Sequence, residues 1–234
     1  MATFLQLAQK IASESGTIEG TLPTTVTGQT KRLGKIVRWT NDAWRAIQNA
    51  HASWKWMRSD FSGSTVAAQR LYTGAQMGIS SRFAEWICTG NADTETRYSS
   101  YLAATGVADE GQLQFVDWDT FYSRCMRGTQ TNGRPIFFSV SPDNQLALHP
   151  IPDAVYTIRG PYRKDVQDLT ADGDIPELPV RFHDLIMDVA LASMLTIHDE
   201  AQVQIGLYRL RQIGRFCELE RDQLPRITMG PALA

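Results

Sequence analysis

Five carboxylates between residues 165 and 177 form the densest group of side chains that could do chemistry. Several carboxylate oxygens in one loop could hold a calcium ion. The D-x-D-x-D-G pattern of a calcium loop is absent, and only Asp172-Gly173-Asp174 resembles part of it. The spacing therefore favours a solvated loop or a charged interface over a metal site. The five residues are Asp165, Asp168, Asp172, Asp174 and Glu177.

The other candidates for catalysis are isolated from one another. Asp117 and Asp119 could act as an acid and base pair, but Asp117 is expected to cap a helix whose N-terminus Asp119 favours. His51 lies close to an apolar stripe and is expected to be a packed histidine of the core or of an interface. No histidine has a second histidine or a cysteine at metal-ligand spacing, and no nucleotide-binding, nucleophile-elbow or zinc-protease motif is present. The sequence thus predicts no catalytic residue, metal or cofactor.

The three cysteines are too far apart for a disulfide framework or a zinc site, which favours synthesis in a reducing compartment. We expect each to be a buried, inert thiol; they are Cys88, Cys125 and Cys217. The most apolar run, residues 185–197, contains Asp188 and is too short to cross a bilayer. The first fifteen residues lack the charged start and cleavage site of a signal peptide.

Residues 37–58, VRWTNDAWRAIQNAHASWKWMR, contain four of the six tryptophans. Seven cations and two acids lie between Lys31 and Asp60. Aromatic side chains interleaved with cations are typical of single-strand nucleic-acid binders. Most of these tryptophans follow an apolar stripe, however, and the whole chain has a net charge of −2. Packing is therefore favoured over specific nucleic-acid recognition.

Two helices are predicted in the N-terminal part. Residues 3–15 have helical apolar spacing, and Thr3 with Gln6 can form a capping box. A threonine-rich loop, residues 17–30, leads to a second helix over residues 31–57, whose stripe includes Trp44. Trp39 and Trp56 lie off that stripe, which indicates a second contact for them, with the β region or with another subunit.

The middle of the chain has the short alternating segments of a β region. Strands are predicted at 64–73, 82–90, 113–116 and 154–163. A hairpin is predicted over 135–150, where SPDN supplies the turn, and a short helix over 117–126. An acidic linker, 164–180, precedes a second helical part, 181–223, which is expected to break near 197–202. The last residues, 224–234, have two prolines and a glycine and are expected to be extended.

The predicted fold class is α+β. The N- and C-terminal helices are expected to form a bundle, with the antiparallel β region inserted between them. The expected parts are 1–60, 61–163, 164–223 and the tail 224–234. Residues 85–119 and 165–188 each hold seven acids and one cation, opposite to the cationic 31–60 segment. Such polarity suits repeated contacts between unlike faces of identical subunits.

The ordered set of segments resembles the head-to-tail adaptor (connector) proteins of tailed bacteriophages. The segments are FLQLAQKIASESG, LGKIVRWTNDAWRAIQNAHASWKWMR, FSGSTVAAQRLYT, FVDWDTFYS, and RPIFFSVSPDNQLALHP followed by Tyr156, Tyr162, IPELP and FHDLIMDVAL. The resemblance covers essentially the whole chain. It implies a structural virion protein of the neck, made in the host cytoplasm and without an active site.

The resemblance also implies partners. The chain would form a ring, expected to be a dodecamer, that docks beneath the portal and joins it to a tail or nozzle protein. DNA would pass the channel as non-specific cargo, and no membrane is involved. Contacts with a neighbouring subunit, or alternatively with the portal, are expected from Arg38, Trp39, Arg45 and Trp56. In related adaptors the C-terminal segment reaches into the portal, and here its anchors would be Leu224, Arg226, Ile227, Met229 and Leu233.

A different class of function stays open at this point. The chain could be a virion-associated enzyme or glycan-binding module with its site in the β region. Trp86, Tyr98 and Tyr101 could stack on sugars, and such a site would need a concave aromatic patch with convergent carboxylates.

Overall fold

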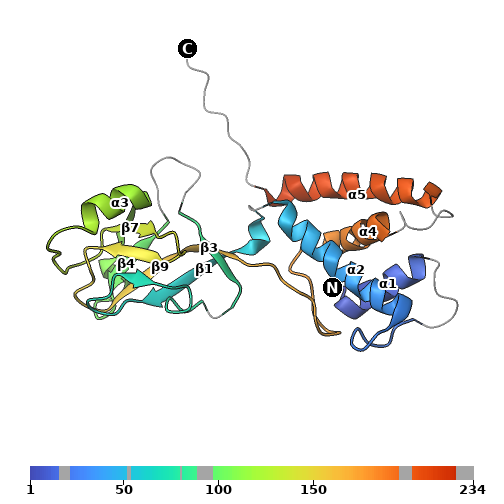
Figure 1. The fold of residues 1–234 in the computed structure, drawn as a ribbon, viewed down its shortest axis with the longest axis horizontal. Helices are drawn as coiled ribbons and strands as arrows, with labels where there is room; N and C mark the ends of the chain where they lie inside the picture. Colours follow the sequence, from blue (N-terminus) through green and yellow to red (C-terminus); the bar gives the residue numbers. More distant parts are fainter. Residues whose placement is uncertain (16–21, 52–53, 80, 89–96, 195–201, 225–234) are drawn as a thin grey trace, which may run out of the picture. The chain divides into compact units, whose positions relative to one another are not determined.

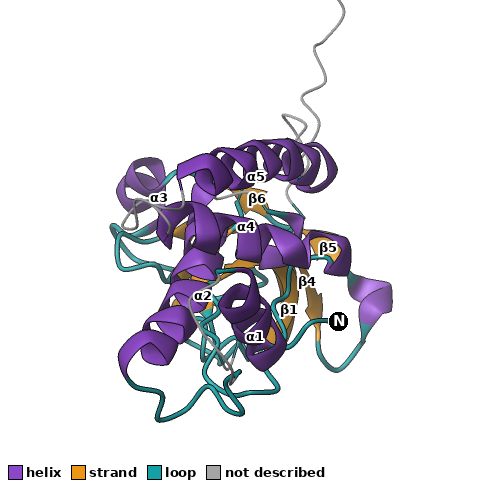
Figure 2. Cartoon of the chain, turned by 90° about the vertical axis from the view of Figure 1, so that its right-hand side faces the viewer, coloured by secondary structure: helices purple, strands orange, loops and turns teal. Residues whose placement is uncertain are grey.

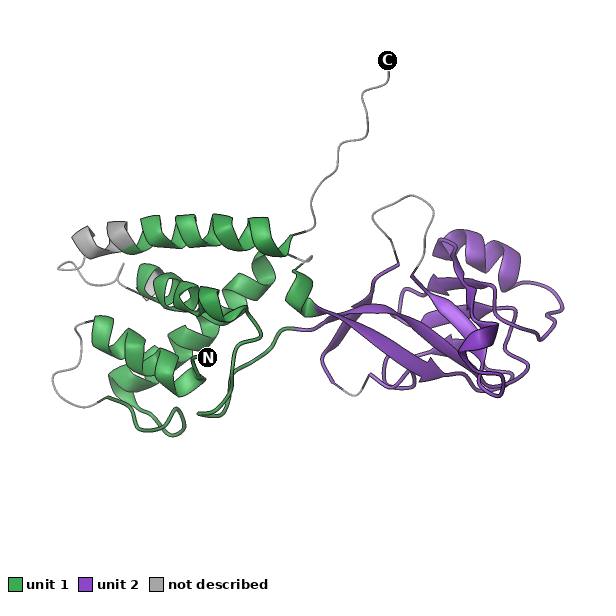
Figure 3. Ribbon diagram, turned by 180° about the vertical axis from the view of Figure 1, so that it is seen from behind, with its two compact units in different colours: residues 1–57, 166–234 green, residues 58–165 purple. Residues whose placement is uncertain are grey.

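The computed structural model describes residues 1–15, 22–51, 54–79, 81–88, 97–194 and 202–224 (Figure 1). The chain is a mixed α+β protein with five α-helices and mostly antiparallel sheets in its described part. It divides into two compact units, with residues 1–57 and 166–234 in unit 1 and residues 58–165 in unit 2 (Figure 3). None of the described helices is both long and apolar enough to cross a membrane.

Unit 1 holds four of the helices. They are α1 (Phe4–Glu14), α2 (Lys31–Ala50), α4 (His183–Met194) and α5 (Gln202–Gln223). The apolar run near the C-terminal part forms α4, which contacts the other three helices (Figure 2). Its described side chains are apolar around most of the circumference and buried, as expected for a helix enclosed by others. One hydrophobic core therefore includes residues from all four helices.

Helix α1 begins where the sequence predicts, at a pair of local hydrogen bonds. The Thr3 hydroxyl accepts a hydrogen bond from the Gln6 backbone N–H at 3.3 Å, and the Gln6 side chain accepts one from the Thr3 N–H at 3.0 Å. The predicted capping box is thus confirmed. Phe4, Leu7 and Ile11 are then buried in the core of unit 1.

The predicted helix over 31–57 is too long. Helix α2 ends at Ala50, because the next residue, His51, takes an extended conformation with φ −141° and ψ 135°. A short 3₁₀ helix, Lys55–Met57, follows beyond residues 52–53, which are outside the described ranges. Trp54 remains buried, and its indole N–H donates to the Ile47 carbonyl at 2.9 Å. The chain therefore packs back onto the helix that it has left.

Unit 2 contains two sheets. The first has the order β1 (Arg58–Ser64), β9 (Tyr156–Lys164), β4 (Ser99–Leu102) and β5 (Gly111–Gln112), with β3 (Phe83–Trp86) also paired to β9. The second has the order β2 (Leu71–Tyr72), β8 (Leu146–His149), β7 (Phe137–Val140) and β6 (Gln114–Phe115). The strand pair β6 with β7 is parallel, which differs from the fully antiparallel region predicted.

The hairpin and the short helix of unit 2 are confirmed. Strands β7 and β8 pair antiparallel from Phe137 opposite His149 to Val140 opposite Leu146. Helix α3 (Trp118–Cys125) begins at Asp117, whose side chain accepts from the Thr120 N–H at 3.0 Å.

Two of the predicted strands are corrected. The prediction of one strand over 64–73 is wrong, because β1 ends at Ser64 and β2 begins only at Leu71. The strand predicted at 113–116 is shorter in the structure, where only β6 forms, and the buried Leu113 separates it from β5, which belongs to the other sheet. The predictions at 82–90 and 154–163 correspond to β3 and β9.

The C-terminal part forms two helices, α4 and α5, as predicted. The expected break at 197–202 falls almost wholly on residues 195–201, outside the described residues, and α5 begins at Gln202. The predicted extended tail also lies outside the described residues, apart from Leu224.

Candidate functional site

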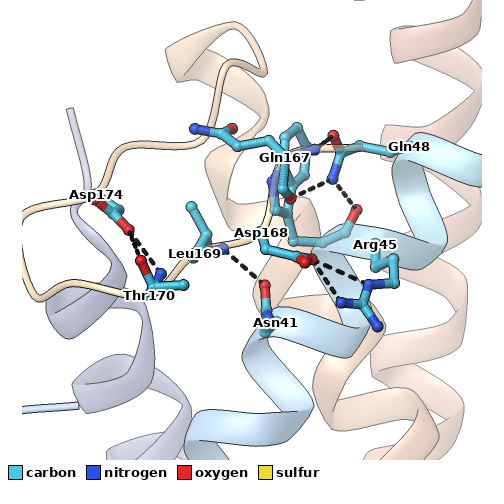
Figure 4. Close-up of polar contacts among 9 residues, drawn as sticks. Asn41, Arg45, Gln48, Gln167, Asp168, Leu169, Thr170 and Asp174 are labelled. Atoms are coloured by element: carbon cyan, nitrogen blue, oxygen red, sulfur yellow. Dashed lines mark hydrogen bonds and ion pairs between the residues drawn. The ribbon is translucent and has the colours of Figure 1, made fainter. Parts of the chain in front are cut away.

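The acidic linker of unit 1 lies along α2 and is attached to it by polar contacts (Figure 4). We call residues 166–177 the strap. The side chain of Gln48 and the backbone of Gln167 form a reciprocal pair, with the Gln167 N–H donating at 2.7 Å and the Gln48 amide donating to the Gln167 carbonyl at 2.9 Å. The Asn41 side chain accepts from the Leu169 N–H at 3.0 Å. Side chains of α2 therefore hold the strap through its backbone.

An ion pair between Arg45 and Asp168 joins the cationic helix to the acidic strap. The Arg45 guanidinium donates to Asp168 Oδ1 through Nη2 at 2.6 Å and Nε at 3.1 Å. Both side chains are about half exposed. The hydrogen bond and charge of Asp168 raise the pKa of Arg45. Arg45, expected at a contact between subunits, thus already has a partner in its own chain.

Two further carboxylates of the strap accept hydrogen bonds from nearby residues. Asp172 accepts from the Val26 N–H at 2.6 Å and from the Thr25 hydroxyl at 3.1 Å. Asp174 accepts from the backbone N–H groups of Thr170 at 2.6 Å and Ala171 at 2.8 Å. The bonds from Ala171 and Thr170 lower the pKa of Asp174, because they stabilise the carboxylate form.

No group of three or more histidine, cysteine, aspartate or glutamate side chains in the described part of the chain could hold a metal ion. The acidic strap is instead part of the architecture of unit 1. Its contacts with α2 connect residues that are between 119 and 128 positions apart in the sequence.

The tryptophan segment packs mainly against unit 1 itself. Trp44 and Trp54 are fully buried, which confirms the predicted stripe at Trp44. Trp56 stacks on Trp54 with ring centroids 4.5 Å apart, and Trp39 also packs partly against the core. Trp39 and Trp56 are half-buried, so only part of each ring is accessible.

The outer face of α2 is polar and largely cationic. Arg38 and Arg45 are exposed on it, together with Asp42 and Asn49. The first turns add three more exposed cations, which are Lys31, Arg32 and Lys35. An acidic surface of another molecule could therefore contact this face.

His51 and the cysteines, the other side chains that could do chemistry, lie apart from one another in sequence. His51 Nε2 lies 2.7 Å from Glu220 Oε1, and the histidine ring meets Trp54 edge-on at 4.8 Å. Cys125 is buried, and burial raises the pKa of the partly buried Cys88 to about 12. The prediction of a buried thiol is wrong for Cys217, which is exposed on α5.

A charged chain of contacts that sequence spacing did not single out joins α1, α4 and α5. Lys10 on α1 pairs with Asp184 at 2.5 Å, and Arg215 on α5 pairs with the fully buried Asp188 at 2.5 Å. Burial raises the pKa of Asp188 despite Arg215. Asp188 had a weak sequence signal as the single charge in an apolar run. Arg215 had none, because its partner is 27 residues away.

The β unit does not assemble the aromatic site expected of a glycan-binding module from the three predicted rings. Trp86 and Tyr98 are buried in its core, where Tyr98 stacks on Phe138 at 4.2 Å. Tyr101 is half-buried, and the Arg159 guanidinium lies 4.9 Å from its ring centre. A hollow of about 470 Å³ contains Asp60 and Glu110, but these three rings do not line it.

In the contacts described above, polar and charged side chains join segments of this chain to one another, such as the strap to α2 and α4 to α5. A family model described as SU10 adaptor protein matches residues 2–230. The chain therefore belongs to the SU10 adaptor protein family, and the resemblance to a phage head-to-tail adaptor is confirmed. A search of curated proteins found no match.

The tail residues expected to bind the portal can be placed only in part. Leu224 is half-buried, packs against the core of unit 1, and donates its N–H to the Glu220 carbonyl at 2.9 Å. Arg226, Ile227, Met229 and Leu233 lie outside the described residues.

Proposed function

We propose that this adaptor forms a ring that docks on the portal, connects it to the tail and encloses part of the DNA channel. The observation that carries the proposal is the family match over residues 2–230, almost the entire chain. The ring is proposed to be a dodecamer in the neck of the virion. Its partners are the portal and a tail or nozzle protein, and DNA is non-specific cargo in transit.

We assign the ring wall to the helices of unit 1, acting as a bundle, and the tail-facing or outer part to the β unit. The division of the chain near residues 57 and 165 supports this assignment of separate roles. Exposed Arg38 and Arg45, with the accessible edges of Trp39 and Trp56, are proposed to contact a neighbouring subunit.

The C-terminal tail is proposed to attach the ring to the portal. Leu224 packs the start of the tail on unit 1. The following residues contain Ile227, Met229 and Leu233, which are apolar for a segment with two prolines and a glycine. An extended apolar segment suits addition to a groove or to a sheet edge of a partner.

Mass measurement of the purified protein, alone and mixed with its purified portal, tests this function. The protein alone is expected to be a monomer when dilute and to form a ring on the portal. A chain that stays monomeric and does not bind the portal at any concentration contradicts the proposal.

A further inference from the structure

Helix α5 has a second apolar face that its own unit leaves exposed. Tyr208 and Leu219 are buried on the inner face. On the other face, Leu210 is 69% and Ile213 is 60% exposed, and Cys217 is exposed one turn further along. Spacings of three and four residues place these three side chains on one stripe of the helix. We call this stripe, with Arg209, Gly214 and Arg221, the ridge.

The glycine in the ridge leaves room for another molecule to come close to the helix. Gly214 lies inside α5, where glycine weakens a helix relative to alanine. A Cβ built at Gly214 meets nothing within 4 Å, so no described neighbour in this chain requires a glycine there. A residue without a side chain allows another backbone to come near this part of the helix.

The charges at the ridge determine what kind of surface fits it. Exposed Arg209 and Arg221 stand near its two ends, on or beside the stripe. Two copies of α5 packed antiparallel through the ridge would bring the arginines of one helix near those of the other, which is unfavourable. The ridge therefore fits an apolar surface edged with acids.

The chain itself presents such a surface at the strap. Ile175 is 39% exposed between Asp174 and Glu177, and Val180 just beyond the strap is 48% exposed. Asp172 and Asp174 accept hydrogen bonds from uncharged groups, which do not neutralise their negative charge. Within unit 1, α5 and the strap lie on opposite sides, with α2 and α4 between them (Figures 1 and 3).

We infer that the ridge of one protomer docks on the strap of a second copy, around Ile175. Because the two surfaces are different and lie on opposite sides of unit 1, the contact repeats head to tail and can close a ring. This inference rests on the proposed ring and names the surfaces that build it.

A cross-link between Ile175→Cys and the native Cys217 tests the contact. The variant is assembled on the portal, treated with a short bis-maleimide and separated under denaturing conditions. Head-to-tail docking gives a covalent ladder of dimer, trimer and larger species, because each protomer carries both thiols. The control I175C/C217S assembles equally and gives no ladder.

A second variant measures the ridge without a cross-linker. Leu210→Asp is expected to raise the protein concentration needed for assembly by roughly tenfold or more, as for loss of a central apolar contact. Val66→Asp, at an exposed position in unit 2, should leave that concentration unchanged.

The outcomes separate the inference from the function on which it rests. A ring that forms but gives no ladder overturns the inference and leaves the proposed function intact. Dimers linked through Cys217 in the wild-type ring indicate contact between two α5 helices and also overturn it. Absence of any ring overturns the proposed function and the inference together.

Discussion

The guanidinium of Arg45 lies 2.6 Å from the carboxylate of Asp168, across 123 residues of sequence. The two residues come from the cationic and the acidic segment of one chain, and they meet within unit 1. Part of the charge polarity along the sequence is therefore used to position the strap on α2. Other charges of the cationic segment remain exposed to solvent, including Arg38.

Loss of Gln48 is expected to destabilise unit 1 more than loss of Arg45. Gln48 is buried, and Gln48→Ala leaves the N–H and carbonyl of Gln167 without their side-chain partner. An unsatisfied polar group costs about 1–3 kcal/mol when it is buried, and Gln167 is only partly buried, so the free energy of unfolding should fall by about 1 kcal/mol. Arg45→Ala breaks a solvent-screened pair and should change the midpoint of urea unfolding little.

The nearly isosteric Gln48→Glu is the matched control, since it keeps an acceptor for the Gln167 N–H and loses the donor to the Gln167 carbonyl. An effect of Arg45→Ala equal to that of Gln48→Ala would show that the ion pair, rather than the backbone contacts, holds the strap.

Truncation of Trp44 tests the core of unit 1. Its side chain is 0% exposed at the centre of the α2 stripe. Trp44→Ala should lower the free energy of unfolding by about 3–5 kcal/mol, as for other large core aromatics. Trp39→Ala, at a half-buried position of the same helix, should cost clearly less. Equal melting temperatures for wild type and Trp44→Ala would contradict the packing described.

The elements that sequence analysis predicted correctly are those with local causes. The capping box of Thr3 and Gln6 and the cap at Asp117 depend on residues within one turn of a helix. The turn between β7 and β8 consists of adjacent residues, from Ser141 to Asn144, whose types favour a turn without help from distant partners.

The elements that were predicted wrongly depend on distant partners. Helical spacing continues past Ala50 to Trp54, so the pattern does not reveal that the chain leaves the helix at His51. Strand β1 contains Gly63 and no β-branched residue, and it is defined by pairing with the distant strand β9. The contacts of Gln48 and Arg45 with the strap likewise have no local signal, because their partners are 119 and 123 residues away.

The stability of unit 1 should depend on pH through Asp174. Backbone donors at Ala171 and Thr170 lower the pKa of its carboxyl below the ordinary value of 3.8. The folded state thus binds a proton less readily than the unfolded state. This contribution to stability is present above pH 3.8 and is lost as the pH falls through the folded pKa.

Urea unfolding of wild type and Asp174→Asn, from well above the ordinary carboxyl pKa down to about pH 2.5, measures this contribution. The variant should be less stable at the upper end, and the difference should shrink toward the lower end. A difference that does not change with pH would contradict the role given to the carboxylate.

Removal of residues 225–234 should separate folding from attachment. The truncated chain keeps Leu224 and its contact with the core of unit 1. Its melting temperature should stay close to that of the full chain, while binding to the portal in a pull-down should be lost. A truncated protein that still docks normally contradicts the proposed anchors, and one that unfolds shows that the tail belongs to the fold of unit 1.

Imaging of the intact virion at the neck tests the central claim most directly. If the chain is the adaptor that we propose, density for a dodecameric ring of this protein should lie directly beneath the portal. The helices of unit 1 should then form the wall of the ring. Density for this chain found only in the capsid or in the tail fibres would contradict the account.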